Sequence, residues 1–233
     1  MAYSDKQFLE ILKPYVLQDM QQTGILASLT AAQAFIESNK GNSGLTQKAN
    51  NLFGIKGEYN GQYVRMLTTE YYNGVKQRVY ANFRKYPSWQ ESIADHSSLF
   101  NRLSRYKNLR GCTDYQQACI NVRLDGYATS PTYTNTLITT INKYKLYEWD
   151  YEVLGGGGGK EEPVKYPTLR MGDRSEYVRA WQTFLNQAGY PCGYEDGIFG
   201  KNTRIAVINW QKDHGLTPDG VIGVKTWNSI PKA

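Results

Sequence analysis

The sequence of 233 residues is poor in cysteine and histidine. Its three cysteines, Cys112, Cys119 and Cys192, are too few for a disulfide framework and form no Cys-x-x-Cys pair or Cys/His cluster of the kind that binds zinc. The two histidines, His96 and His214, stand far apart, which argues against a histidine-based metal site and against a Ser-His-Asp triad. We therefore expect neither a metal ion nor a cofactor.

Long apolar runs are also missing. The longest uncharged stretch, residues 20–36, is interrupted by glutamine, threonine, serine and glycine, so we expect no membrane span. The N-terminus has no basic region followed by an apolar one, so we expect no secretory signal. The net charge of +6 is spread along the chain without a basic block, which excludes an arginine-rich arm and a nucleic-acid partner.

Aromatic residues, in contrast, are abundant, with 19 tyrosines and 5 tryptophans. Their flat apolar faces and polar groups suit sugar rings, although most of them are expected to be core and interface residues. The mild positive charge would also favour a polyanionic surface, such as a bacterial wall that carries acidic polymers.

Five consecutive glycines at residues 155–159 mark the clearest boundary in the chain. Such a run disfavours helix and strand and behaves as a flexible coil. We therefore expect two domains, residues 1–152 and 167–233, joined by a glycine-rich linker over residues 153–166. The second is close to the lower size limit for a domain without disulfides or metal.

An internal repeat characterises the C-terminal domain. The segment DGIFGKNT at residues 196–203 returns as DGVIGVKT at residues 219–226, and each copy predicts an Asp-Gly turn that leads into a helix. A Trp-Gln pair also occurs twice, at residues 181–182 and 210–211. The apolar faces expected for the two helices that carry these pairs consist of Val178, Trp181, Phe184 and Leu185 and of Ile205, Ile208 and Trp210. The pattern predicts a small three-helix unit.

The N-terminal domain has the pattern of an α+β fold. Apolar residues at helical spacing predict helices over residues 6–22, 29–38, 115–124 and 133–147, and another after Pro87. Two β-rich runs, residues 63–72 and 76–83, meet at Asn73-Gly74, which predicts a β-hairpin. We therefore expect a mostly helical domain with one inserted hairpin lobe.

Two carboxylates are candidates for chemistry. Glu37 ends an apolar helix, and no charged residue lies between Asp19 and Glu37, so partial desolvation would raise its pKa and suit a general acid. The alternative is a surface carboxylate paired with Lys40. Glu70 lies in the predicted hairpin, where a glutamate is disfavoured by propensity. One carboxylate on a buried helix and one on a β lobe are the layout of a cleft glycosidase.

Five ordered motifs extend this interpretation. They are AQAFIES around Glu37, NNLFGIKG at 50–57, TTEYYNG at 68–74, FRKYPSWQESIADHSSLF at 83–100 and GYATSPTYTNTL at 126–137. The segment from about residue 5 to residue 147 resembles the endo-β-N-acetylglucosaminidases of glycoside hydrolase family 73, found in autolysins, flagellar muralytic proteins and phage lysins. The resemblance implies a lysozyme-like α+β fold and cleavage between GlcNAc and MurNAc in peptidoglycan.

The same resemblance implies roles for individual residues. Glu37 would be the general acid and Glu70 the second carboxylate. A functional tyrosine corresponds to Tyr127, with Tyr133 as the reserve, and Ser130 stands where the family usually has aspartate. The residues expected on the cleft floor, or alternatively in a structural turn, are Asn50, Asn51, Phe53 and Gly54.

Residues 168–230 resemble a peptidoglycan-binding domain with a three-helix core, through the repeated turns and the Trp-Gln pairs. Most of these motif residues are expected to hold the fold, so no ligand contacts are assigned. Tethering such a domain to a hydrolase would raise its effective concentration on an insoluble polymer. The expected partner is bacterial peptidoglycan, and a monomer is assumed.

The expected function is therefore an endolysin-type hydrolase of the GlcNAc-β-1,4-MurNAc bond. The alternatives are a muramidase or lytic transglycosylase of the lysozyme-like superfamily, and a non-catalytic wall-binding protein. The missing signal and the start at Met1 favour a phage endolysin held in the host cytoplasm before lysis, where free cysteines fit the reducing compartment. A secreted autolysin that lacks its signal is the alternative.

Overall fold

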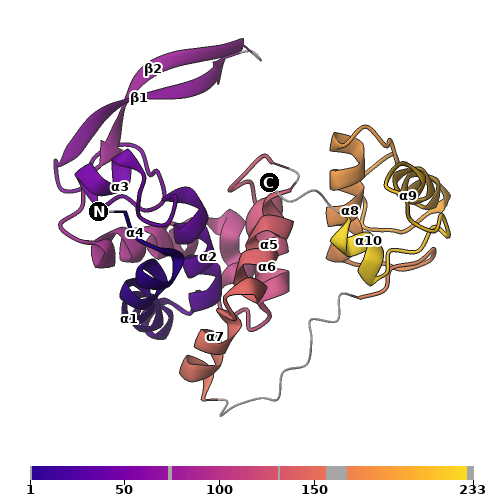
Figure 1. The fold of residues 1–233 in the computed structure, drawn as a ribbon, viewed down its shortest axis with the longest axis horizontal. Helices are drawn as coiled ribbons and strands as arrows, with labels where there is room; N and C mark the ends of the chain where they lie inside the picture. Colours follow the sequence, from indigo (N-terminus) through magenta and orange to yellow (C-terminus); the bar gives the residue numbers. More distant parts are fainter. Residues whose placement is uncertain (1, 73–74, 131, 156–166, 230–233) are drawn as a thin grey trace. The chain divides into compact units, whose positions relative to one another are not determined.

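The computed structural model describes residues 2–72, 75–130, 132–155 and 167–229 (Figure 1). These residues form helices and one two-stranded antiparallel sheet, which confirms the expected α+β class. In chain order the elements are α1 (Asp5–Thr23), α2 (Ala27–Glu37), α3 (Gly44–Ala49), β1 (Tyr63–Tyr72), β2 (Val75–Arg84), α4 (Trp89–Arg102), the 3-10 helix η1 (Ser104–Leu109), α5 (Tyr115–Leu124), α6 (Tyr133–Lys143), α7 (Tyr147–Leu154), α8 (Glu176–Gln187), α9 (Lys201–Asp213) and α10 (Val224–Asn228).

The chain forms two compact units, each built from two stretches of sequence. The first comprises Met1–Ala118 and Thr140–Gly158, and the second comprises Cys119–Thr139 and Gly159–Ala233. This division groups residues 119–139 with the C-terminal residues, whereas the glycine run predicts a boundary near residue 152. The expected domain limits stay a prediction, and residues 156–166 of the expected linker lie outside the described residues.

Helix α2 is buried over most of its length, since every residue from Ala27 to Phe35 is buried. Its alanines and other compact side chains allow neighbouring helices to approach closely. Helix α1 packs against α2, α4 and α7, and α7 also packs against α2. These contacts hold α2 in place, so its last residue, Glu37, stands at the end of a well-supported element.

Helix α1 begins and ends at strong capping signals. Ser4 and Gln7 form a capping box, in which each side chain accepts a hydrogen bond from the other residue's backbone N–H at 3.0–3.3 Å. Gly24 ends the helix with a left-handed φ of 72°. The predicted helix over residues 6–22 is thereby confirmed, and its apolar face is buried through Phe8, Leu9, Leu12, Val16 and Met20.

Strands β1 and β2 form the predicted hairpin. They pair in an antiparallel register that runs from Tyr63 opposite Arg84 to Tyr72 opposite Val75. The predicted turn at residues 73–74 lies outside the described residues. The strands leave the rest of the first unit as a separate lobe (Figure 1).

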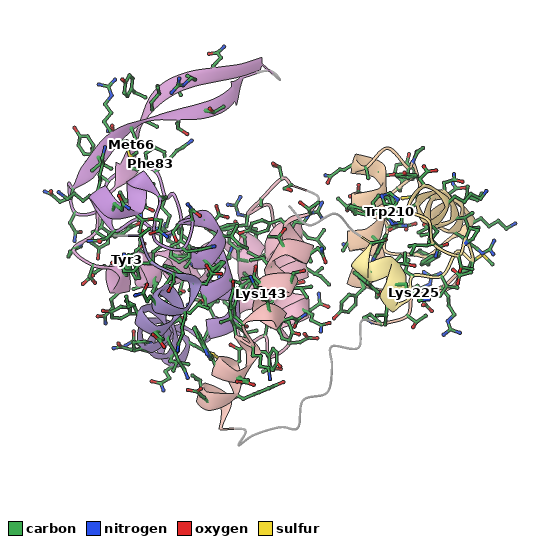
Figure 2. The ribbon with its side chains drawn as sticks, viewed as in Figure 1. Tyr3, Met66, Phe83, Lys143, Trp210 and Lys225 are labelled. Carbon is green, nitrogen blue, oxygen red and sulfur yellow. The ribbon has the colours of Figure 1, made fainter. Side chains whose placement is uncertain are left out.

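The two faces of the hairpin have different surroundings. Val64 and Met66 are partly buried, and Phe83, which pairs with Val64, is buried. The Met66 Cε atom lies 3.9 Å from the position of a Cβ placed on Gly44, the first residue of α3. Met66 and Phe83 lie at the end of the hairpin near α3 (Figure 2). The opposite face exposes Tyr63, Leu67 and Tyr80.

The helix predicted over residues 133–147 is shorter than expected. Helix α6 ends at Lys143, and Lys145 adopts a left-handed φ of 53°, which an α-helix cannot continue through. The Leu146 N–H donates to the Ile141 carbonyl at 2.9 Å and closes the turn. The chain then starts α7, which the sequence did not predict as a separate helix.

Three helices and two turns form the C-terminal part of the second unit, as predicted. Val178, Trp181, Phe184 and Leu185 are buried on α8. On α9, however, Ile205 is 55% exposed, so its assignment to the buried face was wrong. The buried face of α9 is set by Thr203, Ala206, Val207 and Trp210, which follow helical spacing.

The first turn of the repeat is held by a buried glutamine. Gln182 Nε2 donates to Asp196 Oδ1 (2.9 Å), to the Ile198 carbonyl (3.0 Å) and to Thr203 Oγ1 (3.1 Å). Gln182 Oε1 accepts a hydrogen bond from the Gly197 N–H at 2.8 Å. Both the nitrogen and the oxygen of this amide are therefore bonded within one turn and the helix that follows it.

The second turn repeats this arrangement. Gln211 Nε2 donates to Asp219 Oδ1 (2.9 Å), to the Val221 carbonyl (2.9 Å) and to Thr226 Oγ1 (3.1 Å). Gln211 Oε1 accepts from the Gly220 N–H at 2.9 Å. Each Trp-Gln pair therefore belongs to the same structural repeat as one Asp-Gly turn.

Within the described ranges, no helix combines the length and apolar character needed to cross a bilayer. Cys112, Cys119 and Cys192 are free thiols. Cys119 and Cys192 are buried, and Cys112 is partly exposed.

Candidate active site

Glu37 is the last residue of α2, and its side chain is exposed. The expectation that the protein itself desolvates this carboxylate was therefore wrong, because the helix is buried only up to Phe35. The expected alternative, a pair with Lys40, stays a prediction. The Lys40 ammonium lies 2.7 Å from an Asp5 carboxylate oxygen.

The loop that follows Glu37 has an unusual backbone. Asn39, Lys40 and Gly41 have left-handed φ values of 49°, 58° and 75°. Two consecutive non-glycine residues in this region are costly and persist only where neighbouring structure holds them. Part of that support is the buried Ser38, whose Oγ donates to the Ala34 carbonyl at 2.5 Å and accepts from the Gly41 N–H at 2.7 Å.

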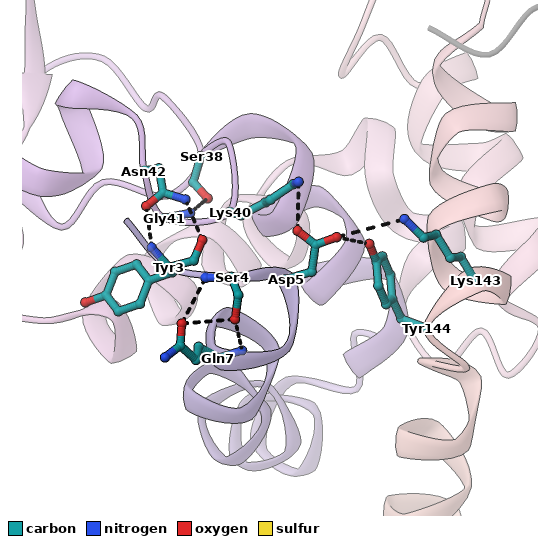
Figure 3. Close-up of polar contacts among 10 residues, drawn as sticks. All are labelled: Tyr3, Ser4, Asp5, Gln7, Ser38, Lys40, Gly41, Asn42, Lys143 and Tyr144. Atoms are coloured by element: carbon teal, nitrogen blue, oxygen red, sulfur yellow. Dashed lines mark hydrogen bonds and ion pairs between the residues drawn. The ribbon is translucent and has the colours of Figure 1, made fainter. Parts of the chain in front are cut away.

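The N-terminal segment provides the rest of the support (Figure 3). The Tyr3 N–H donates to Asn42 Oδ1 at 2.8 Å, and Asn42 Nδ2 donates back to the Tyr3 carbonyl at 3.0 Å. Asp5 pairs with Lys40 and accepts a hydrogen bond from the Tyr144 hydroxyl. The bonds from Lys40 and Tyr144 hold the pKa of Asp5 below its usual value. The loop after Glu37 is thus tied to both α1 and the chain after α6.

The other end of α2 is capped from a distant part of the chain. Leu26 at the N-cap has no capping side chain. Asp150 of α7 takes this role, because its Oδ1 accepts from the Ser28 N–H at 2.8 Å and its Oδ2 contacts Ser28 Oγ at 2.5 Å. Burial raises the pKa of Asp150 to about 6, against the lowering effect of the Ser28 bonds.

Glu70 lies on β1, opposite Gln77 of β2. Along β1 it occupies the same alternate set of positions as Met66 and Thr68. The Glu70 side chain lies outside the described residues, so its expected role as second carboxylate stays a prediction.

Asn50 and Asn51 use their side chains to shape the chain after α3. Asn50 Nδ2 donates to the carbonyls of Tyr86 and Pro87 at 3.1 and 3.0 Å. Asn51 is buried, and its Nδ2 donates to the carbonyls of Ile55 and Arg84, both at 2.9 Å. These contacts support the structural alternative for both residues, and their expected contact with substrate stays a prediction.

Phe53 and Gly54 follow in the same segment. The Phe53 ring is buried and stacks on the His96 imidazole, with centroids 3.8 Å apart and planes at 13°. Burial lowers the pKa of His96 to about 3, so this histidine is neutral near pH 7. Gly54 is exposed and has a left-handed φ of 66°, and no atom lies within 4 Å of the position of an added Cβ. Backbone conformation, not crowding, favours glycine there.

A polar cluster that sequence analysis did not assign fixes the end of β2 against α4. Asp95 Oδ2 lies 2.5 Å from Arg84 Nη1 and 2.6 Å from the Tyr86 hydroxyl. Burial and the bond to Asp95 raise the pKa of Tyr86. The three residues occur within the motif at residues 83–100, so the motif was visible but its internal contacts were not.

Tyr127 and Tyr133 both belong to the second unit, and the structure brings their rings together. The centroids are 5.9 Å apart and the planes meet at 26°. Tyr133 is 7% exposed, whereas Tyr127 is partly exposed. Among the described residues, no group of three or more His, Cys, Asp and Glu side chains is arranged to hold a metal ion.

Comparison with known proteins identifies both parts of the chain. Residues 13–146 match the family described as mannosyl-glycoprotein endo-beta-N-acetylglucosaminidase, and residues 174–230 match the putative peptidoglycan binding domain. The chain is 38% identical to the exo-glucosaminidase LytG of Bacillus subtilis over 61% of its own length and 52% of LytG. It is 37% identical to an autolysin of Enterococcus faecalis over 76% of its length and 27% of that protein.

A solved structure shows the same fold. The catalytic domain of the autolysin Auto from Listeria monocytogenes matches with a TM-score of 0.60 and 33% identity, over 64% of this chain and 91% of that domain. This match, together with the helices and the two-stranded hairpin, places the N-terminal part among lysozyme-like α+β domains. Because the first family model covers more than half of the sequence, the chain belongs to the glucosaminidase family. It spans about half or less of the length of the two curated relatives.

Proposed function

We propose that the chain is a glycosidase of bacterial peptidoglycan that hydrolyses the GlcNAc-β-1,4-MurNAc bond. Glu37 is the general acid and Glu70 the second carboxylate. The position of Glu37 carries the proposal. It is the exposed last residue of a buried helix, and the loop that follows it contains residues with left-handed backbone conformation that neighbouring segments hold in place. Family membership supports the reaction class, and the wall-binding match supports the polymer.

The chemistry follows from these positions. A general acid must be protonated when it meets the glycosidic oxygen, and a bound glycan that covers the exposed Glu37 would raise its pKa by desolvation. Glu37 then donates its proton to the leaving oxygen. Glu70 activates water or stabilises the oxocarbenium-like charge. A carboxyl separation of about 5 Å would favour double displacement, and about 6.5–9.5 Å single inversion.

Tyr127 is the preferred third participant. Its phenol would hold the acetamido group of the substrate or position the attacking water. Partial exposure supports Tyr127 over Tyr133, which is 7% exposed and stacks on the Tyr127 ring. Tyr133 would then orient the Tyr127 ring rather than contact the substrate.

The C-terminal helices would retain the enzyme on the wall. While the C-terminal helices are bound to the insoluble polymer, the catalytic domain stays near its substrate, which raises its effective concentration there. The proposed setting is lysis of the wall, either by a phage endolysin released from the host cytoplasm or by a bacterial autolysin. The names of two relatives, autolysins of Enterococcus faecalis and Listeria monocytogenes, support the second setting.

The test is digestion of purified peptidoglycan, followed by borohydride reduction and mass spectrometry of the new ends. We expect glucosaminitol. Muramitol or 1,6-anhydro-muramic ends would keep the wall-hydrolase class but contradict the proposed bond. The absence of new ends, with binding to sacculi retained, would favour a non-catalytic wall-binding protein.

Two further measurements sharpen the result. Glu37→Gln should abolish release of reducing ends while binding to sacculi is unchanged, and unaltered activity in this variant would contradict the general-acid role. The relative named as an exo-glucosaminidase raises the second candidate, removal of terminal residues. Long glycan fragments early in the digestion would support internal cleavage, and single GlcNAc units would support the exo mode.

A further inference from the structure

Two hollows whose lining does not include Glu37 have similar chemistry. The first, which we call the Trp89 pocket, has a volume of about 310 Å³ and is lined by Tyr3, Gly41, Thr46, Gln47, Asn50 and Trp89. The rings of Tyr3 and Trp89 are 5.6 Å apart and nearly perpendicular, at 69°. Tyr3 is 39% exposed and Trp89 partly exposed, so two aromatic surfaces form a corner that solvent can reach.

The second hollow, which we call the Tyr59 pocket, has a volume of about 260 Å³ and is lined by Tyr59, Asn60, Gln62, Lys85, Tyr86 and Pro87. Its accessible ring is Tyr59, which is partly exposed and packs on the buried ring of Tyr86, with centroids 4.8 Å apart and planes at 53°. Side-chain amides stand beside the rings in both pockets, Gln47 and Asn50 in the first and Asn60 and Gln62 in the second.

The two pockets are neighbours. Asn50 in the wall of the Trp89 pocket donates hydrogen bonds to the carbonyls of Tyr86 and Pro87 in the wall of the Tyr59 pocket, at 3.1 and 3.0 Å. Only Ser88 separates Pro87 from Trp89 in the chain. A polymer could therefore pass from one pocket to the other over the Asn50–Pro87 contact.

The repeated lining selects for a repeated ligand. Aromatic faces suit the apolar faces of pyranose rings, and amides suit hydroxyl and acetamido groups. A single-stranded nucleic acid would need cations along its backbone, and Lys85 is the only basic residue among the lining residues. Accessible aromatic rings and neutral amides at two adjacent positions suit a glycan strand.

We propose that the Trp89 and Tyr59 pockets together form an accessory glycan-binding strip, in which each pocket takes one N-acetylated sugar of the same strand. The choice of ligand rests on the proposed function, whereas the site does not include Glu37. The strip would hold a strand on the first unit while another stretch is cleaved, which raises the local concentration of substrate.

The experiment measures binding at the strip directly. The full chain with Glu37→Gln is labelled with 5-fluorotryptophan, which gives resonances for its 5 tryptophans, and Trp89→Phe assigns one of them. The probe is the β-1,4-linked tetramer of N-acetylglucosamine. We expect a saturable shift of the Trp89 resonance. No shift at Trp89 would overturn the proposal, whether or not the unmodified enzyme releases glucosaminitol ends.

Two variants test the lining. Tyr3→Ala removes a ring but keeps the backbone bonds between Tyr3 and Asn42, so the fold is retained. We expect about fivefold weaker binding of the tetramer at Trp89, which corresponds to the loss of one stacking contact. The matched control is Tyr194→Ala, because Tyr194 is 92% exposed on the second unit and should not alter the Trp89 titration. Equal effects of the two variants would contradict the site.

A third variant tests whether one strand occupies both pockets. Tyr59→Ala should weaken binding of the tetramer by a similar factor, but should leave binding of the N-acetylglucosamine dimer at Trp89 unchanged. Tyr3→Ala should weaken both. If Tyr59→Ala had no effect on the tetramer, the continuous strip would be refuted.

Discussion

The ammonium group of Lys40 lies 2.7 Å from the carboxylate of Asp5, and this contact ties the loop after Glu37 to the first turn of α1. Lys40 has a left-handed backbone, so the ion pair acts at one of the strained positions of the loop. Asp5 also contacts Tyr144 and lies 3.9 Å from Lys143 (Figure 3). One carboxylate therefore joins three segments that are distant in the sequence.

Asp5→Asn should impair turnover more than substrate binding. Loss of the charge frees Lys40 and loosens the loop that orients Glu37, so we expect kcat to fall roughly threefold to tenfold with little change in KM, as for misplaced catalytic groups. The control is Glu10→Gln, which removes the more exposed, 3.8 Å pair of Glu10 with Lys6 on the same helix. Steady-state kinetics on a soluble glycan measure both. A fall in kcat for Glu10→Gln of the same size would contradict the positioning role.

Asp150 should contribute to stability as the cap of α2. At pH 5, Asp150→Ala leaves the Ser28 N–H and hydroxyl without their partner, and we expect a loss of about 2–4 kcal/mol of unfolding free energy. Asp150→Asn is the matched control, since an amide has the shape of a protonated carboxyl group and can still accept from the Ser28 N–H. It should cost less than about 1 kcal/mol. Urea unfolding compares them, and equal losses would argue against capping.

The pH dependence of stability follows from three buried groups. Burial raises the pKa values of Asp19 and Asp150 to about 6, so between about pH 4 and 6 the folded state holds one more proton at each than the unfolded chain. Burial lowers the pKa of His96 to about 3, so in the same window the unfolded chain holds one more proton there. The net excess is one proton in the folded state. Stability should therefore fall as pH rises, by about 1.4 kcal/mol per pH unit.

The double variant Asp19→Asn/Asp150→Asn reverses this sign. Of the three buried groups only His96 then titrates across the window, and stability should rise by about 1.4 kcal/mol per pH unit between pH 4 and 6. The pKa values of Asp5, Glu91 and Asp196 are lowered, so these groups add a rise of stability with pH that is confined to the lower edge of this window. Urea unfolding at several pH values measures both slopes. A falling slope in the double variant would show that other groups control the response.

Local patterns predicted the elements of the fold well. The Asn-Gly dipeptide between two β-rich runs predicted the hairpin, and apolar spacing predicted α1, α2 and α8, because both signals act over a few residues. The break between α6 and α7 was missed, since the left-handed turn at Lys145 carries no glycine or proline signal. The buried face of α9 was misassigned because Ile205 is apolar but lies outside the stripe that contacts α8.

Contacts across the chain were beyond the reach of these patterns. The pairing of Asp150 with Ser28 and of Asp5 with Lys40 depends on tertiary packing, and neither residue stood out by spacing. The exposure of Glu37 was misjudged for the same reason, because an apolar run does not reveal where the helix leaves the core. The sequence patterns therefore predicted a candidate acid but not the residues that hold the loop after it.

Gln182 and Gln211 give the last prediction. Each amide satisfies its own turn through an equivalent set of four contacts, so truncation of either should leave several buried polar groups unpaired. We expect Gln182→Ala and Gln211→Ala each to destabilise the second unit by about 2–4 kcal/mol and to reduce retention on sacculi. Turnover of a short soluble glycan should change much less.

Asn209→Ala serves as the control for both glutamine variants, because Asn209 is exposed on α9 and its loss should cost less than about 0.5 kcal/mol. Unfolding followed by the fluorescence of Trp181, Trp210 and Trp227, which lie in the core of the second unit, measures the effect. Because the two partner sets match, the two glutamine variants should be destabilised by similar amounts. Wild-type stability in either one would mean that its turn is held by the backbone alone, and the repeat would then not explain why both helices carry glutamine after tryptophan.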